Sequence, residues 1–294
     1  MNITQALDRY LVQLEADGRS PHTVGQCRRH IRLLAAWLAG AGHSGELGDI
    51  DHEVLARFLA SPMARTRPDS RPKKATAMNC LRSSIRTFFA YLAQAGYLPS
   101  NPAGVVKRAL CSPPPPRSLS EADQGRLLTT LAAAEGPEAE RDHMLFHLML
   151  ASGVRLGSAL VIETTDVDLE RGELTLRSAK GDRPETVYIG VAIREHLRRF
   201  LATRTEGPLF ARRDGHPLTP RHVERRFQEW LERTGITSKA SPHSLRHAFA
   251  QGLYQRTHDI LLVKAALRHR SISSTLVYAR VDSNRLREAL SGSF

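Results

Sequence analysis

Apolar side chains recur every three to four positions along most of the first hundred residues, and this spacing predicts amphipathic helices. The pattern runs through residues 20–41, 51–61 and 73–97. Ser20 is of the residue type that caps a helix and Pro21 suits a first helical position, so the first of these helices is expected to begin there. We therefore predict a small N-terminal helical bundle.

A run of four prolines, Pro113–Pro116, breaks the helical pattern. Consecutive prolines cannot continue a helix and favour an extended, semi-rigid spacer. The sequence thus predicts a helical domain at 1–105, a proline-rich linker at 106–117 and a second domain at 118–294.

The second domain opens with further helical patterns. One helix is expected within 118–134, where Ser120 is a candidate N-cap, and another through 141–153. A third helical pattern starts at Arg155 and continues into 156–165.

Residues 172–190 follow a different period, because apolar and polar side chains alternate there. This alternation, interrupted by a short polar stretch, predicts a β-hairpin with Lys180 in its turn. Helical spacing returns from 191 onward. The predicted fold class is therefore mostly α with a small antiparallel β-sheet.

The charge of the chain favours a polyanionic partner. Forty-two Lys and Arg against 30 Asp and Glu give a formal charge of +12 and a pI near 10.2. Such a balance suits nucleic acid through counterion release, although acidic membrane surfaces also attract basic proteins. Basic residues on the outward faces of the N-terminal helices are either phosphate contacts or solvated side chains: Arg28, Arg29, Lys73, Lys74, Arg82 and Arg86.

The cysteines and the hydropathy of the chain indicate in which cellular compartment the protein works. The three cysteines are widely spaced and form no CxxC pair, so neither a disulfide framework nor a zinc knuckle is expected, and a reducing cytoplasm fits. The N-terminus lacks the apolar block of a signal peptide. The longest apolar stretch, near 144–154, is interrupted by His147 and is too short to span a bilayer, so no membrane anchor is expected.

One histidine pair has the spacing of a metal site. His243 and His247 lie four residues apart, as in zinc proteases, but that pattern requires Glu at the position of Ser244. Arg246 between the two histidines also disfavours a nearby cation. We therefore expect no catalytic metal.

Four segments carry candidate chemistry in a fixed order: ASGVRLGSAL, SAKGDRPETVYI, SPHSLRHAFAQGL and LVKAALRHRSISSTLVYARV. This order resembles the tyrosine recombinases, the family of phage integrases, integron integrases and Xer-type recombinases. The resemblance covers residues 118 to the end, and the N-terminal part resembles the family's SAM-like core-binding domain. It implies six catalytic residues: Arg155, Lys180, His243, Arg246, His269 and Tyr278.

The chemistry of strand exchange explains why these residue types are needed. Tyr278 would be the nucleophile, and the two arginines would bind the non-bridging oxygens of the phosphate through charge-assisted forks. Lys180 resembles the family's general acid for the leaving 5′ oxygen. His243 would accept the tyrosine proton or bind the phosphate, and His269 would donate to a non-bridging oxygen.

Two positions depart from the family pattern. Ser158 stands where an acidic residue usually follows the first arginine, and Arg268 replaces the small residue of the family's LGH motif. The first change affects how Arg155 is held. The second alters local packing or adds a phosphate contact.

The resemblance implies a site-specific recombinase that works without metal or nucleotide cofactor. Strands of two double-stranded DNA sites would be exchanged through a 3′-phosphotyrosyl link and a Holliday junction, by four protomers. The segment 279–294, with Leu286 and Leu290 at helical spacing, is expected to pack on a neighbouring protomer or on its own domain. The chain shows no arm-binding domain, which indicates a two-domain recombinase of Xer or transposon type.

Two other functions remain open from the sequence. A type IB topoisomerase shares the tyrosine chemistry but reseals the same strand. A DNA-binding regulator would keep the fold without cutting.

Overall fold

The computed structural model describes residues 1–111, 118–177, 184–202, 204 and 206–279. The chain divides into two compact units, Met1–Pro113 and Pro114–Phe294. Each unit has its own cluster of buried hydrophobic side chains. The predicted fold class, mostly helical with a small antiparallel sheet, is confirmed.

The first unit is a helical bundle. Side chains cap its helices where the sequence predicted a start: the Ser20 hydroxyl accepts the amide of Thr23, and the carboxylate of Asp51 accepts that of Val54. Tyr10, buried, packs edge-on against Phe88. The helices are α1 (Ile3–Ala16), α2 (Pro21–Gly40), α3 (His52–Ala60), α4 (Pro62–Arg65) and α5 (Ala75–Gln94).

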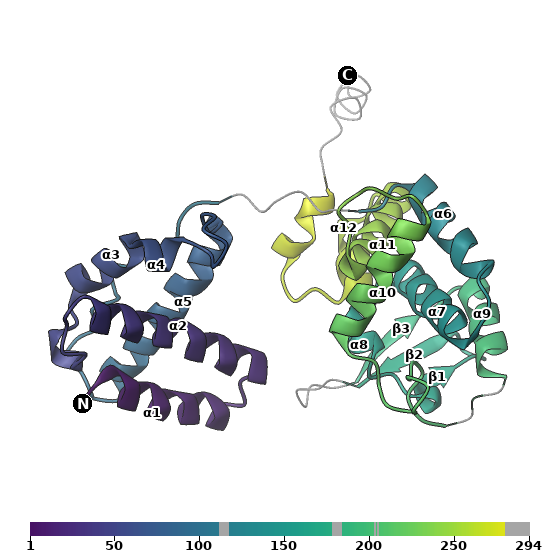
Figure 1. Ribbon diagram of the computed structural model, residues 1–294. Coiled ribbons are helices and arrows are strands. Elements are labelled where there is room, and N and C mark those ends of the chain that lie inside the picture. Colours follow the sequence, from purple (N-terminus) through teal and green to yellow (C-terminus); the bar gives the residue numbers. More distant parts are fainter. Residues whose placement is uncertain (112–117, 178–183, 203, 205, 280–294) are drawn as a thin grey trace, which may run out of the picture. The chain divides into compact units, whose positions relative to one another are not determined.

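The second unit holds the remaining helices and the sheet (Figure 1). Ser120 caps its first helix by accepting the amide of Asp123, as the sequence predicted. The helices are α6 (Glu121–Ala132), α7 (Pro137–Ser152), α8 (Leu156–Ala159), α9 (Val191–Leu201), α10 (Pro220–Arg233), α11 (Pro242–Thr257) and α12 (Ile260–Leu267), followed by 3-10 turns at Ile272–Ser274 and Leu276–Tyr278.

The sheet has the antiparallel order β1 (Val167–Asp168), β2 (Glu173–Leu176), β3 (Glu185–Tyr188). Leu174 pairs with Val187, and both side chains are buried on the core face while their neighbours are more exposed. The predicted hairpin strands are therefore present. Its turn, with Lys180, lies outside the described residues.

The helix expected from Arg155 into 156–165 is shorter than predicted, because α8 ends after one turn. The segment that follows is rich in β-branched residues, which fit extended backbone better than helix. There the amide of Leu209 donates to the carbonyl of Ile162 at 2.8 Å, so this stretch pairs with a distant segment.

A buried carboxylate fixes α7 against α10. Asp142 accepts hydrogen bonds from Arg226 at 2.8 Å and from the Trp230 indole at 2.9 Å, and it also pairs with Arg141. Pairing compensates for the cost of burying these charges. Among the described residues, no helix has the length and hydropathy needed to cross a membrane.

Candidate active site

The first arginine of the site is positioned by a sharp helix end. α7 stops at Gly153, whose φ of 62° is the left-handed conformation that glycine adopts readily. A Cβ at Gly153 would lie 2.3 Å from a ring carbon of Phe249 in α11, so glycine permits the close approach of the two helices. Arg155 follows at the N-cap of α8, with an exposed side chain whose Nη2 lies 3.4 Å from the Arg268 carbonyl.

The second arginine is buried in the middle of α11. Arg246 is 1% exposed, and its guanidinium donates to the carbonyl oxygens of Gly153 and Leu267, the latter at 2.5 Å. It therefore ties the end of α7 to the end of α12. Burial, and then the charges of Arg155 and Arg268, lower the pKa of Arg246 to about 9, which leaves it a cation at neutral pH.

Two histidines sit beside these cations and are held neutral. Burial, followed by Arg246 and Arg155, lowers the pKa of His243 in the first turn of α11 and lowers that of His269 to about 4. The Nδ1 atom of His269 shares a 2.9 Å hydrogen bond with the hydroxyl of buried Thr275. That contact leaves Nε2 as the nitrogen that a substrate would meet.

Tyr278 ends the 3-10 turn after α12 and is 9% exposed. Its ring belongs to a small apolar cluster with Ala250, Val263 and Leu267. Burial raises the pKa of Tyr278, and the charge of Arg246 opposes this shift. The tyrosine is thus protonated at neutral pH, with a cation close enough to stabilise its anion.

The hydroxyl of Tyr278 lies 2.5 Å from Nδ1 of His247, a residue whose spacing from His243 suggested only a zinc ligand. Burial lowers the pKa of His247 to about 4, and His243, Arg246 and His269 add to the effect. In the tautomer whose Nδ1 is unprotonated, the neutral ring accepts this hydrogen bond from the tyrosine hydroxyl. The position of His247, four residues after His243 on the same helix face, was the available signal.

Five of the six predicted site residues thus meet at one place in the second unit, contributed by the α7–α8 turn, α11 and the segment after α12. The sixth, Lys180, lies outside the described residues. Nothing in the described part of the chain forms an ion pair with Arg155, and Ser158 offers its backbone amide to the Arg155 carbonyl at 3.0 Å.

Arg268, the other departure from the family pattern, occupies a strained and enclosed position. It caps α12 with φ 53°, a left-handed conformation that is costly for a side chain larger than glycine. Its Nε lies 3.4 Å from a carboxylate oxygen of Glu185 in β3. Nε and Nη2 are nevertheless buried without a hydrogen-bond acceptor among the residues that the structure describes. Arg268 therefore adds positive charge at the edge of the site and links α12 to the hairpin.

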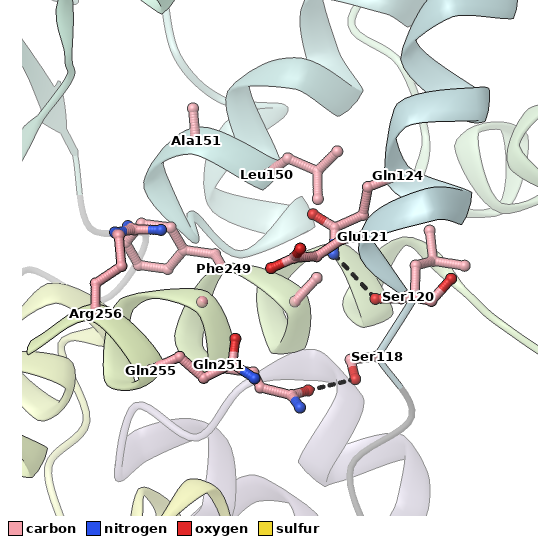
Figure 2. Close-up of a pocket in the computed structure, with 13 residues that line it drawn as sticks. Ser118, Ser120, Glu121, Gln124, Leu150, Ala151, Phe249, Gln251, Gln255 and Arg256 are labelled. Atoms are coloured by element: carbon pink, nitrogen blue, oxygen red, sulfur yellow. Dashed lines mark hydrogen bonds between the residues drawn. The ribbon is translucent and has the colours of Figure 1, made fainter. Parts of the chain in front are cut away.

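A separate hollow of about 420 Å³ lies among the start of α6, the end of α7 and α11 (Figure 2). Its lining is mostly polar, and Ser118 donates a 2.6 Å hydrogen bond to Gln251 across it. None of the predicted site residues is part of this lining. The hollow is distinct from the tyrosine site.

Known proteins with similar sequences share both units. Residues 117–285 match the phage integrase family, and residues 7–96 match the phage integrase N-terminal SAM-like domain. Tyrosine recombinase XerC of Chromobacterium violaceum is 29% identical over 292 residues, covering 98% of this chain and 94% of that protein. Tyrosine recombinase XerD of Ralstonia nicotianae is 30% identical over 294 residues, covering 97% and 92%.

Solved structures show the same fold. The XerH site-specific recombinase bound to difH substrate in a pre-cleavage complex matches with a TM-score of 0.74 at 22% identity, covering 99% of this chain and 84% of that one. Its post-cleavage complex on palindromic difH matches with a TM-score of 0.73 at 21% identity, covering 91% and 79%. The similarity to XerC and XerD along the whole chain favours recombination over the topoisomerase and regulator alternatives. The chain therefore belongs to the phage integrase family and is a Xer-type tyrosine recombinase, an enzyme of site-specific DNA recombination.

Proposed function

We propose that Tyr278 is the nucleophile that cuts each DNA strand. Its oxygen forms a bond to phosphorus while the bond from phosphorus to the 5′ oxygen breaks, which leaves a 3′-phosphotyrosyl link and a free 5′ hydroxyl. The observation that carries this proposal is the Tyr278 hydroxyl, bonded to neutral His247 while the charge of Arg246 acts on the same oxygen. Since the protein link conserves the bond energy, religation needs no nucleotide cofactor.

The two arginines are proposed to bind the non-bridging oxygens of the scissile phosphate. Both remain protonated at working pH and supply the positive charge that a metal would otherwise provide. The carbonyl contacts of Arg246 support this role, because they fix the orientation of its guanidinium before DNA arrives.

The histidines are proposed to enter the reaction in their neutral form. His247 accepts the hydroxyl proton of Tyr278, and His243 donates an N–H to the phosphate. When Nδ1 of His269 accepts from Thr275, its Nε2 carries the proton and donates to a non-bridging oxygen. Lys180 keeps its predicted role as the acid that protonates the leaving 5′ oxygen.

Double-stranded recombination sites are the proposed substrate. Basic side chains of the first unit support this proposal, because they can bind DNA phosphates. Arg29 on α2, Lys74 at the N-cap of α5 and Arg86 on α5 are exposed. Arg28 and Arg82 are half-exposed, whereas Lys73 donates to the Ala64 carbonyl at 2.8 Å.

The number of protomers and the cellular compartment are proposed from the likeness to the family. Four protomers would exchange strands through a Holliday junction, and the C-terminal segment, whose residues 280–294 lie outside the described part of the chain, would pack on a neighbouring protomer. The three free cysteines, two of them exposed, fit a reducing cytoplasm.

A suicide duplex tests the nucleophile. The duplex carries the site that the protein selects from a randomised DNA pool, with a nick opposite the reactive phosphate so that the cleaved end diffuses away. The wild type is expected to accumulate a protease-sensitive covalent complex, and Tyr278→Phe none, with DNA binding nearly unchanged. Tyr188→Phe, a change at a 75% exposed tyrosine, is the matched control and should react like the wild type.

A covalent adduct with Tyr278→Phe would place the nucleophile elsewhere. Relaxation of supercoiled DNA without joining of two sites would instead favour topoisomerase activity. Absence of any adduct with the wild type would favour a regulator.

A further inference from the structure

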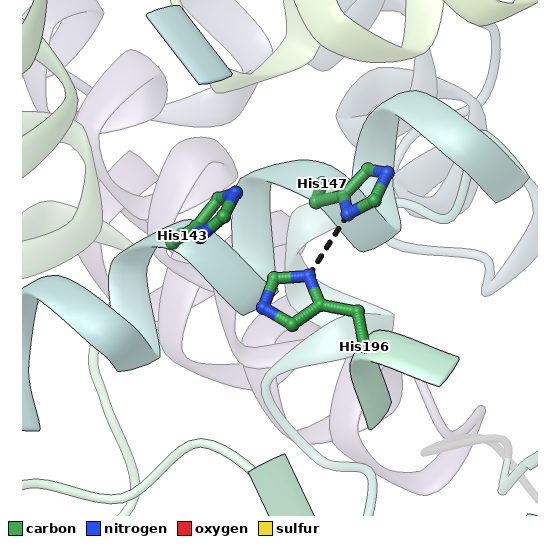
Figure 3. A group of neighbouring side chains, drawn as sticks. All are labelled: His143, His147 and His196. Atoms are coloured by element: carbon green, nitrogen blue, oxygen red, sulfur yellow. Dashed lines mark hydrogen bonds between the residues drawn. The ribbon is translucent and has the colours of Figure 1, made fainter. Parts of the chain in front are cut away.

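Three histidines converge away from the tyrosine site, on the faces where α7 and α9 meet (Figure 3). His143 and His147 lie one turn apart on α7, and their rings stack with centroids 6.0 Å apart. His196 reaches them from α9: its Nδ1 lies 2.9 Å from that of His147, and its ring centroid lies 4.4 Å from that of His143. One nitrogen from each ring lies within 4.8 Å of the other two.

The three rings are held in the form that binds metal. Burial lowers the pKa of His143 and His196 to about 4 and also lowers that of His147. Among the described residues, the other charges that act on the cluster are its own members and the Arg199 guanidinium. Each imidazole is therefore neutral at pH 7 and carries a lone pair.

The spacing suits a tetrahedral ion. Zinc binds histidine nitrogen at about 2.0–2.1 Å, which places tetrahedral ligand atoms about 3.3 Å apart. The Nδ1 atoms of His147 and His196 lie 2.9 Å apart, and one nitrogen from each of the three rings lies within 4.8 Å of the others, so small side-chain rotations would bring three nitrogens to one ion. All three rings are half-buried, which leaves room for a water molecule as the fourth ligand.

Without a metal ion, the ring nitrogens of the three histidines have fewer bonding partners than they would have with one. Within the described residues, the hydrogen bond between His147 and His196 uses one nitrogen of each, while His143 contributes ring contacts alone. An ion would coordinate all three at once. The nearby charge of Arg199 opposes an ion, but that side chain is exposed and free to point into solvent.

We propose that His143, His147 and His196 bind a divalent transition-metal ion, zinc foremost, which clamps α7 to α9. α7 ends three residues before Arg155, and α9 begins three residues after the β3 strand of the hairpin. The ion would thus brace two elements that support the tyrosine site. His147 precedes Gly153 by six residues, about 9 Å along the helix axis, so the ion would brace α7 at a distance from the turn that carries Arg155.

Zinc binding to full-length protein without a histidine tag tests the site. After treatment with a chelator and alkylation of the exposed thiols of Cys80 and Cys111, the wild type is expected to bind one zinc ion per chain in equilibrium dialysis. His196→Asn and His147→Asn should each weaken binding at least about 100-fold, because each removes one of three protein ligands. His216→Asn, a change at an exposed histidine of the same unit, should bind as the wild type does.

Thermal unfolding supplies a second readout. At a zinc concentration about 100-fold above the dissociation constant, the Tm of the catalytic unit should rise by about 5–10 °C in the wild type and not in His196→Asn. Cobalt added in place of zinc should give the visible absorption bands of a four-coordinate ion. With chelator present, the variants should have the same Tm as the wild type. If His147→Asn or His196→Asn fails to fold, His143→Asn replaces it in both measurements.

The proposal is overturned if the wild type binds zinc only at millimolar concentration. Binding that is equally strong in His196→Asn would also overturn it, by placing the ion elsewhere. Both results are independent of DNA cleavage, so neither bears on the proposed role of Tyr278.

Discussion

The hydroxyl of Tyr278 and the Nδ1 atom of His247 lie 2.5 Å apart, although 31 residues separate them in the chain. Both groups are neutral at pH 7, because burial raises the pKa of the tyrosine and lowers that of the histidine to about 4. In the tautomer of His247 whose Nδ1 is unprotonated, the hydroxyl donates and the imidazole accepts. It aims the proposed nucleophile and provides a place for its proton.

His247→Leu is expected to slow formation of the covalent complex about 100-fold, since it removes the acceptor that holds the tyrosine. His247→Asn should lose no more than about tenfold, because the Asn side-chain oxygen accepts a hydrogen bond near the place of Nδ1. Single-turnover cleavage of the suicide duplex at saturating protein measures both rates. With a pKa of about 4, His247 stays neutral between pH 6 and 8, so the ratio of wild-type to Asn rates should be constant there.

Equal rates for the Leu and Asn variants would mean that His247 acts by packing alone. A Leu variant that cleaves at the wild-type rate would remove His247 from the reaction. Gel-shift titration of each variant checks that DNA binding is unchanged.

Lys180→Ala should slow cleavage of ordinary DNA by about 100-fold or more and should be largely rescued on DNA whose bridging 5′ oxygen is sulfur. A thiolate leaves without a proton, so the acid is no longer needed. The measurement compares single-turnover rates on the two substrates. Lys239→Ala, at an exposed lysine, is the control that should leave both rates unchanged. Equal defects on both substrates would rule out Lys180 as the general acid.

Arg268→Gly is expected to stabilise the catalytic unit by about 1 kcal/mol, measured by urea unfolding. The change relieves a left-handed φ of 53° and removes two buried nitrogen donors that have no acceptor within the described part of the chain. Its ion-pair partner Glu185 is half-exposed, so the loss of that pair costs no more than about 1 kcal/mol and Glu185→Gln should change stability little. A large loss of stability in Arg268→Gly would show that packing of the arginine stem outweighs the strain.

The features that the sequence predicted correctly depend on residues close together in the chain. Ser20 and Ser120 cap helices that begin where the residue types indicated, because a cap depends on neighbours two or three positions away. The alternating pattern around the hairpin likewise produced paired strands. Each of these features is decided within a few residues.

Long-range packing explains what the sequence missed. The bond between His247 and Tyr278 depends on how the turn after α12 packs against α11, which no local pattern encodes. His196 meets His147 across 49 residues for the same reason. α8 is short because the residues after it pair with a segment more than 40 residues away.

Ser158 stands where the family usually has an acidic residue, and this difference changes how Arg155 is held. That arginine is exposed, its side chain reaches the Arg268 carbonyl at 3.4 Å, and its charge acts on Arg246 and Arg268. In the described part of the chain Ser158 contacts Arg155 through its backbone amide, and the uncharged serine leaves the full positive charge of Arg155 available to the phosphate.

Ser158→Glu is therefore expected to have two opposing effects on cleavage. The new carboxylate would hold Arg155 by a charge-assisted bond, which improves its placement, and would neutralise part of the field that stabilises the phosphorane. We expect the cleavage rate to stay within about tenfold of the wild type, equivalent to about 1.4 kcal/mol in barrier height, with the larger change in assembly or in the balance between cleavage and ligation. Single-turnover cleavage and religation assays measure both. A loss of several orders of magnitude, with folding and DNA binding intact, would show that Arg155 works through its uncompensated charge and that its site is built differently from the family's.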